Sequence, residues 1–154
     1  MRRRRQRGNA MLETALIFLP LFAIIFAILD FGLVIFIKST LQHAVREGAR
    51  YAVTYQLKGA MGHDLSIKTV VQENSLGFLS GSTGLDRIKV RYYQPDTFTE
   101  TSYNWPGNLV EISVENYTWK WIIPLWREPG QLSLVARALD RMEGLPAGTT
   151  PPAR

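Results

Sequence analysis

Few residues in this sequence are of types that support catalysis or metal binding. There is no cysteine, and His43 and His63 are the two histidines. This excludes disulfides, thiolate metal sites, a cysteine nucleophile and a multi-histidine metal centre. The sequence also has no glycine-rich phosphate loop and no G-x-S-x-G nucleophile motif. We therefore predict that the chain is not an enzyme and that it uses no metal and no cofactor.

Two carboxylates lie in or beside a long apolar stretch. The stretch covers residues 14–37, Asp30 is its one ionisable member, and Glu13 directly precedes it. A carboxylate bordering an apolar helix is tolerated only when it is paired or near water. Glu13 could be an interfacial residue that the dipole of the helix N-terminus favours. Asp30 could mark the end of a lipid-embedded segment, or it could make a helix-to-helix contact together with Phe31 and Gly32.

The apolar stretch is long enough to cross a membrane. A bilayer core of about 30 Å needs about 20 apolar helical residues, and residues 14–37 exceed this length. Five arginines precede Gly8, and the rest of the chain carries no net charge. The positive-inside rule then keeps the N-terminus cytoplasmic and exports the remainder. The basic charge therefore belongs to the N-terminus and indicates no nucleic-acid-binding face.

A cleaved secretory signal peptide is the competing interpretation of this stretch. The apolar region of a signal peptide is shorter, and small residues follow it at the cleavage site. Here the residues after the stretch, 38–42, contain no A-x-A pattern and continue as a helix. A membrane anchor is the favoured interpretation.

A second periodicity extends the helix beyond the apolar stretch. Apolar residues recur at i, i+3 and i+4 over residues 41–53, which predicts one face of an amphipathic helix. Most of them are small, so another element can approach this face closely. We expect one helix over about residues 9–58, with the glycines at 59 and 62 near its end. The apolar stripe consists of Leu41, Ala44, Val45, Gly48, Ala49, Ala52 and Val53.

Residues 59–144 predict a small folded domain. Loose helical spacing over residues 65–79 predicts a short helix, and residues 94–107 form a polar loop. Alternating apolar residues predict strands at 87–93 and 108–119. Residues 131–141 could form a strand or a helix, and their alternation favours a third strand. The Pro- and Thr-rich tail, residues 145–154, is expected to be disordered. The predicted fold class is α+β, with the long N-terminal helix packed on a small antiparallel sheet.

The aromatic residues of this domain have two interpretations. Exposed aromatic rings could bind sugars or peptides, but packing in the sheet core and in a connector between the last two strands explains them more simply. The residues concerned are Trp105, Tyr117, Trp119, Trp121 and Trp126.

The N-terminal motifs, taken together, resemble a known family. The segment RRRRQRGNAMLETALIFLPL is similar to a class III prepilin leader, in which a basic leader ends in glycine and a glutamate is the fifth residue past the cut. The order NAMLETALIFLPLF, DFG, QHAVREGARYAV resembles the TadE-like minor pilins, or pseudopilins, of the tight-adherence (Flp) pilus system. By this resemblance residues 1–8 are the leader, the cut lies between Gly8 and Asn9, and Glu13 is the fifth mature residue.

The resemblance implies a structural role in assembling or priming a pilus for adhesion or secretion. The chain would lie in the bacterial inner membrane with a periplasmic C-terminal domain and would then enter an extracellular pilus. Glu13 would meet the new amino group of Asn9, either its own or a neighbour's. The implied partners are a prepilin peptidase, other pilins or pseudopilins, the inner-membrane assembly platform and membrane lipid, and no nucleic acid. The alternatives are a signal-anchored periplasmic binding domain unrelated to pili and a small exported enzyme.

Overall fold

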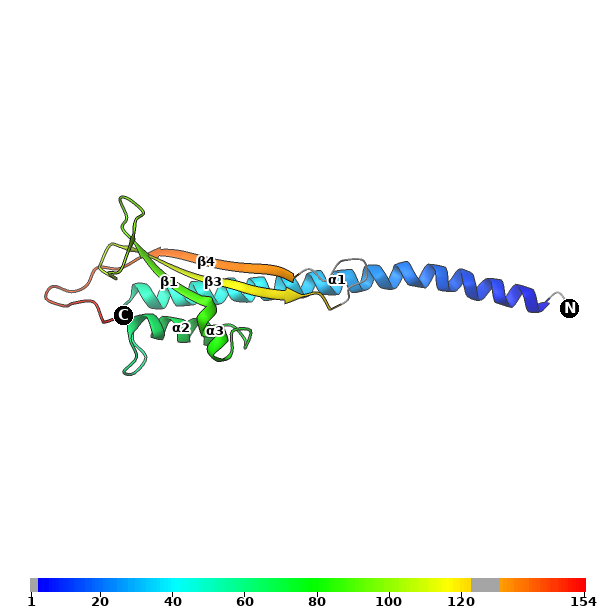
Figure 1. The fold of residues 1–154 in the computed structure, drawn as a ribbon, viewed down its shortest axis with the longest axis horizontal. Coiled ribbons are helices and arrows are strands. Elements are labelled where there is room, and N and C mark those ends of the chain that lie inside the picture. The colour runs from blue at the N-terminus through cyan, green and yellow to red at the C-terminus, as the bar shows by residue number, and fades with distance from the viewer. Residues whose placement is uncertain (1–2, 123–130) are drawn as a thin grey trace.

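The computed structural model describes residues 3–122 and 131–154, with side chains of the N-terminal helix from Ala10 onward. Helix α1 (Arg3–Val53) is continuous over 51 residues. Figure 1 shows its C-terminal half lying along the sheet and its N-terminal half extending beyond the domain. The elements after α1 are α2 (His63–Glu73), α3 (Gly81–Arg87), β1 (Ile88–Tyr93), β2 (Glu100–Thr101), β3 (Leu109–Lys120) and β4 (Gln131–Arg141).

The four strands form one antiparallel sheet in the order β2-β1-β3-β4. The predicted α+β fold class is confirmed, and β1, β3 and β4 match the three predicted strands closely. The register of β3 against β4 shifts between Val114 and Tyr117, where Asn116 has a φ of 57°. An irregularity of this kind changes which residues face the core. As a result Val114 and Tyr117 are both buried although they are three positions apart.

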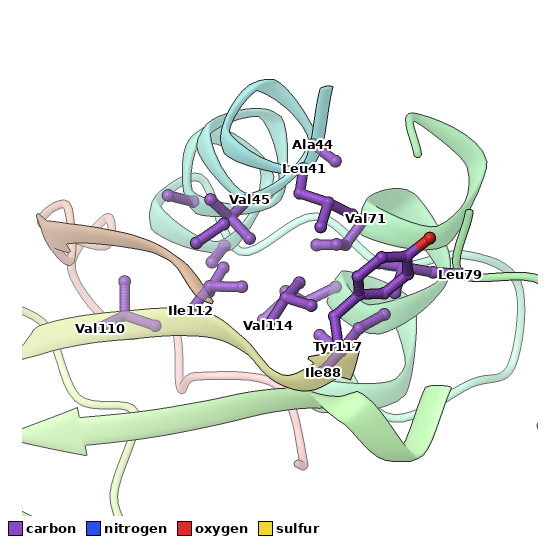
Figure 2. Close-up of a cluster of buried hydrophobic side chains, with 14 of the residues drawn as sticks. Leu41, Ala44, Val45, Val71, Leu79, Ile88, Val110, Ile112, Val114 and Tyr117 are labelled. Atoms are coloured by element: carbon purple, nitrogen blue, oxygen red, sulfur yellow. The ribbon is translucent and has the colours of Figure 1, made fainter. Parts of the chain in front are cut away.

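The hydrophobic core lies between the sheet and the C-terminal half of α1. All seven residues of the predicted apolar stripe are buried. Figure 2 shows Leu41 and Val45 of α1 pointing toward the side chains of β3, with Val71 of α2 beside them. A Cβ atom at Gly48 would overlap Val71 Cγ2 and would lie 3.4 Å from Ile112 Cδ1. The small residue at this position therefore allows α2 to approach α1 closely, as the sequence predicted.

Several boundaries differ from those expected. Helix α1 ends at Val53 instead of residue 58, because Tyr55 adopts a φ of 55° and a left-handed residue terminates a helix. Helix α2 ends at Glu73, and Leu76 with a φ of 52° lies in the turn that follows. The short helix α3 and the two-residue strand β2 were not predicted. The aromatic connector predicted around Trp126 falls in residues 123–130, outside the described residues.

The C-terminal tail also differs from the expected disorder. Its last residues pack against the end of the domain opposite the N-terminal half of α1. The backbone N–H of His63 donates to the carbonyl of Ala153 at 2.8 Å, and Asn104 Nδ2 donates to the carbonyl of Pro152 at 3.0 Å. Proline and threonine content indicated a flexible tail, but it did not reveal the polar partners that hold the tail in place.

Candidate functional site

No other element packs against the N-terminal part of α1 within the described residues. From Ala10 to Leu29 every side chain is exposed except the half-buried Ala23, and we call this range the bare segment. It spans about 30 Å along the helix axis, which is the thickness of a bilayer hydrocarbon core. Large apolar side chains cover it, with Leu16 78% and Leu19 72% exposed. Such a continuous exposed apolar surface marks a membrane or protein contact.

The bare segment ends earlier than the apolar composition suggested. We expected the lipid-embedded part to continue to residue 37, but Asp30, Val34 and Ile37 are already buried. These residues are on the helix face that packs on the domain. Helix α1 passes the length and composition criteria for a membrane-crossing helix, and no other helix in residues 3–122 and 131–154 does. The structure is therefore compatible with anchoring through the bare segment.

Glu13 lies on the exposed surface of the bare segment. Asn9 is one helical turn before it, about 6 Å away along the axis, and Gly8 belongs to the same continuous helix. This spacing is what a charge pair between the residue 9 amino group and the residue 13 carboxylate requires. The cleavage at Gly8 and the pairing of Glu13 remain predictions.

Asp30 fixes the end of β3 to the helix at the point where the bare segment stops. Its side chain is 5% exposed, and Asp30 Oδ1 accepts a hydrogen bond from the backbone N–H of Ile122 at 3.3 Å. Beside it, the ring of Phe31 meets the ring of Trp121 edge-on at 5.4 Å between centroids. Asp30 and Phe31 thus make contacts within their own chain. A Cβ atom at Gly32 would meet nothing within 4 Å, so this fold does not require a glycine there.

Replacing Asp30 with alanine is expected to loosen the end of β3. The change removes the acceptor of the Ile122 N–H, and a lost buried hydrogen bond costs about 1–3 kcal/mol. Amide hydrogen exchange should therefore become faster at Ile122 and Trp121, while exchange in the centre of β3 stays slow. Asp30→Asn keeps an acceptor oxygen and is the matched control. Equal exchange in the alanine variant and the wild type would show that this hydrogen bond does not hold the strand end.

A polar cluster lies at the opposite end of the domain. His63 Nδ1 is 3.2 Å from Tyr92 Oη and 3.4 Å from Asn104 Nδ2. Tyr92 donates to Asp64 Oδ1 at 3.0 Å, and Arg154 Nη2 forms an ion pair with Asp64 at 2.9 Å. The guanidinium of Arg154 also lies 4.7 Å from the centre of the Tyr92 ring. This cluster joins α2, β1 and the tail.

Burial controls the protonation of this cluster. It lowers the pKa of His63, against the opposing effects of the Asp64 carboxylate and the Ala52 carbonyl. It raises the pKa of Tyr92, and the neighbouring Asp64 raises it further. At neutral pH the histidine is uncharged and the tyrosine keeps its proton. The sequence contains no indication of the cluster, because its members come from α2, β1, the loop at Asn104 and the C-terminal tail, which are far apart along the chain.

Stability is expected to fall as the pH decreases below the ordinary histidine value of about 6.5. The folded state lowers the pKa of His63, so the unfolded chain binds more protons in the range between the two pKa values. Each pKa unit by which folding lowers the pKa of His63 corresponds to about 1.4 kcal/mol of stability. Urea unfolding between pH 8 and pH 5 should show a smaller loss of stability in His63→Gln than in the wild type. The exposed His43 supplies the control, and a His43→Gln variant that removes the pH dependence would contradict this assignment.

The polar cluster does not resemble a metal site. In the ranges that the structure covers, no three His, Cys, Asp or Glu side chains converge in a way that could hold a metal ion. The cluster instead connects three segments through hydrogen bonds, an ion pair and a cation–π contact. Its arrangement fits a structural role in holding the C-terminal tail against α2 and β1.

Comparison with protein families gives a match to the N-terminal part of the chain. No curated protein and no solved structure matches the chain. The model of a family described as TadE-like protein matches residues 8–50, a range that contains Gly8, Asn9, Glu13 and Asp30 and ends in the buried stripe of α1. The resemblance predicted from the N-terminal motifs is thereby confirmed: residues 8–50 of this chain match the TadE-like protein family.

Proposed function

We propose that this chain is a membrane-anchored minor pilin or pseudopilin that acts in assembling or priming a tight-adherence pilus. The TadE-like match supports an association with such a pilus, and the apolar helix is compatible with membrane anchoring. One observation carries the finer proposal. The bare segment begins two residues after Gly8, is as long as a bilayer core is thick, and continues without a break into the core of the folded domain.

The residues around Gly8 suit cleavage by a membrane peptidase at the cytoplasmic edge of the helix. A residue without a side chain lets the backbone come close to a peptidase active site. The five preceding arginines would hold this edge at an anionic membrane surface, at about 1 kcal/mol each. Cleavage creates an amino group on Asn9, and Glu13 is the carboxylate one turn away that could meet it.

The charge distribution supports an orientation for the anchored protein. Since the basic residues of the leader favour the cytoplasm, the domain after residue 29 would be periplasmic. After cleavage, the bare segment would leave the membrane by associating with the helices of other pilins or pseudopilins. The protein would be a peptidase substrate and an assembly subunit with no catalysis of its own. The assembly platform would supply the energy for extraction.

The proposal is tested by N-terminal mass spectrometry of the membrane-extracted protein. In cells with an active prepilin peptidase the wild-type chain should begin at Asn9. The Gly8→Ala variant, and the wild type in a peptidase-null strain, should keep the leader. Gly32→Ala is a matched control on the same helix and should still be cut after Gly8. An intact leader in peptidase-active cells would overturn the proposal and would favour a signal-anchored periplasmic domain.

A further inference from the structure

We propose that the end of the domain facing the bare segment is a lipid-contacting surface, so that the domain rests on the bilayer. This surface is formed by Trp121 and Ile122, which directly follow β3, and by Leu76 in the turn between α2 and α3. The inference rests on the proposed membrane anchor. It adds a second membrane contact, made by the folded domain itself.

The end of β3 lies at the level of the helix where the bare segment stops. Asp30 accepts the hydrogen bond of the Ile122 N–H, and the Trp121 ring contacts Phe31. These contacts place Ile122 within about one helical turn of the edge of the hydrocarbon core. Ile122 nevertheless keeps 60% of its surface exposed. An apolar side chain is thus presented where the lipid headgroups would begin.

The turn between α2 and α3 reaches the same end of the domain. Figure 1 shows α2 running back toward the bare segment. The Phe78 ring meets Phe36 of α1 edge-on at 6.2 Å, which places the turn about 9 Å along the axis from Asp30. Leu76 in this turn is 70% exposed, although its neighbours Ser75 and Leu79 are fully buried.

The backbone of Leu76 adopts a conformation that is unusual for leucine. Its φ of 52° is in the left-handed region, which costs an L-residue about 1–2 kcal/mol. Glycine or asparagine is the usual solution there. The turn instead holds a leucine outward at this cost, and it gains little burial within the chain. Phe98 at the far end of the domain has the same φ and a similar exposure, so the inference rests on the position of Leu76 beside the bare segment and not on its strain.

The chemistry of this end of the domain fits a membrane interface. Tryptophan is enriched at the level of lipid headgroups, because its ring is apolar and its N–H is polar. Lys120 directly precedes Trp121, and Lys38 lies about two turns past Asp30 on α1; both are exposed. Lysines at this depth extend to the headgroup phosphates while their stems cover apolar surface. The residues that follow β3 and the turn between α2 and α3 therefore present apolar side chains, and β3 and α1 contribute the two exposed lysines.

The absence of cysteine allows a direct test on the full chain. Single cysteines at Ile122 and Leu76 would carry a nitroxide spin label in vesicles of phosphatidylethanolamine with phosphatidylglycerol. Phe98 is the matched control, since it has the same φ of 52° and is 66% exposed in a loop at the far end of the domain. Ile17, which lies in the bare segment and is 67% exposed, reports whether the anchor itself is inserted. The measurement is spin-label accessibility to oxygen relative to a water-soluble nickel chelate.

We expect the oxygen-to-nickel accessibility ratio at positions 122 and 76 to be several-fold higher than at position 98, and lower than at position 17. Ratios at 122 and 76 equal to that at 98, with a high ratio at 17, would overturn this inference and leave the anchor intact. A low ratio at 17 would overturn the anchor and this inference with it. The protein-to-lipid ratio can then be raised with unlabelled protein. If this lowers the accessibility ratios at positions 122 and 76, other subunits cover these residues, and that result would also overturn the inference.

Discussion

Replacing both Leu19 and Phe22 with lysine is expected to remove the protein from the membrane fraction. Both positions lie near the middle of the bare segment on one face of the helix, and both are exposed. A lysine at the centre of a membrane helix costs about 2.5–3.5 kcal/mol on the insertion scale, so two lysines cost about 5–7 kcal/mol. Carbonate extraction of cell membranes should release the double variant and retain the wild type.

The folded domain supplies the control for this experiment. Phe98 and Tyr103 are 66% and 60% exposed in the domain, so a Phe98→Lys/Tyr103→Lys variant carries the same added charge outside the bare segment. This control should remain in the membrane fraction. Thermal unfolding of the domain in detergent should be unchanged by Leu19→Lys/Phe22→Lys, because these side chains pack on no other described element. A double variant retained as fully as the wild type would show that the bare segment is not the anchor.

Replacing Gly48 with alanine is expected to lower the free energy of unfolding by about 1–3 kcal/mol. The added methyl group would overlap Val71 Cγ2 and approach Ile112 Cδ1. Val71 is a short, stiff side chain that is fully buried, so α2 itself would have to move. Chemical unfolding in detergent, followed by tryptophan fluorescence, measures the loss.

Gly32 is the matched control for this substitution, since it lies on the same helix with open space at its Cβ position. Alanine is favoured over glycine inside a helix by about 0.8–1.0 kcal/mol. Gly32→Ala should therefore leave stability unchanged or raise it. Equal destabilisation by the two variants would contradict the packing described for Gly48.

Periodicity was sufficient to predict the framework of the domain. The spacing of Leu41, Val45 and Gly48 identified the buried helix face, since a face at i, i+3 and i+4 can bury itself on one side only. Alternation identified β1, β3 and β4 for the corresponding reason in strands. Strict alternation after Val114 would bury residue 116, and the register shift in β3 explains why Tyr117 is buried instead.

Composition could not predict where the bare segment ends. Val34 and Ile37 are as apolar as the residues of the bare segment, but they face the chain's own domain. Hydropathy does not distinguish a protein partner from a lipid partner, so residues 30–37 were expected in the membrane. For Asp30 the sequence left a membrane boundary and a helix-to-helix contact open. Its partner Ile122 is distant in the sequence, and no pattern connects the two.

The tail shows the same limitation for polar contacts. Arg154 forms an ion pair with Asp64 and contacts the Tyr92 ring, and both partners are distant from it in the sequence. The composition of a proline- and threonine-rich segment does not indicate contacts of this kind. The proposed cleavage residues are a different case. Gly8, Asn9 and Glu13 were selected by the resemblance to the TadE-like family, and the match over residues 8–50 includes them. Their roles remain predictions for the N-terminal mass spectrometry.

Helix α1 connects the bare segment rigidly to the far end of the folded domain. Pro20 lies inside the bare segment, and no proline or break interrupts α1 between Asp30 and Val53, so an inclination of the helix at Asp30 is carried through to Val53. The part of α1 from Asp30 to Val53 is about 35 Å long. A tilt of about 20°, ordinary for a membrane helix, would swing its far end sideways by about 12 Å. Small adjustments to bilayer thickness would thus become large displacements of the surface that neighbouring proteins encounter.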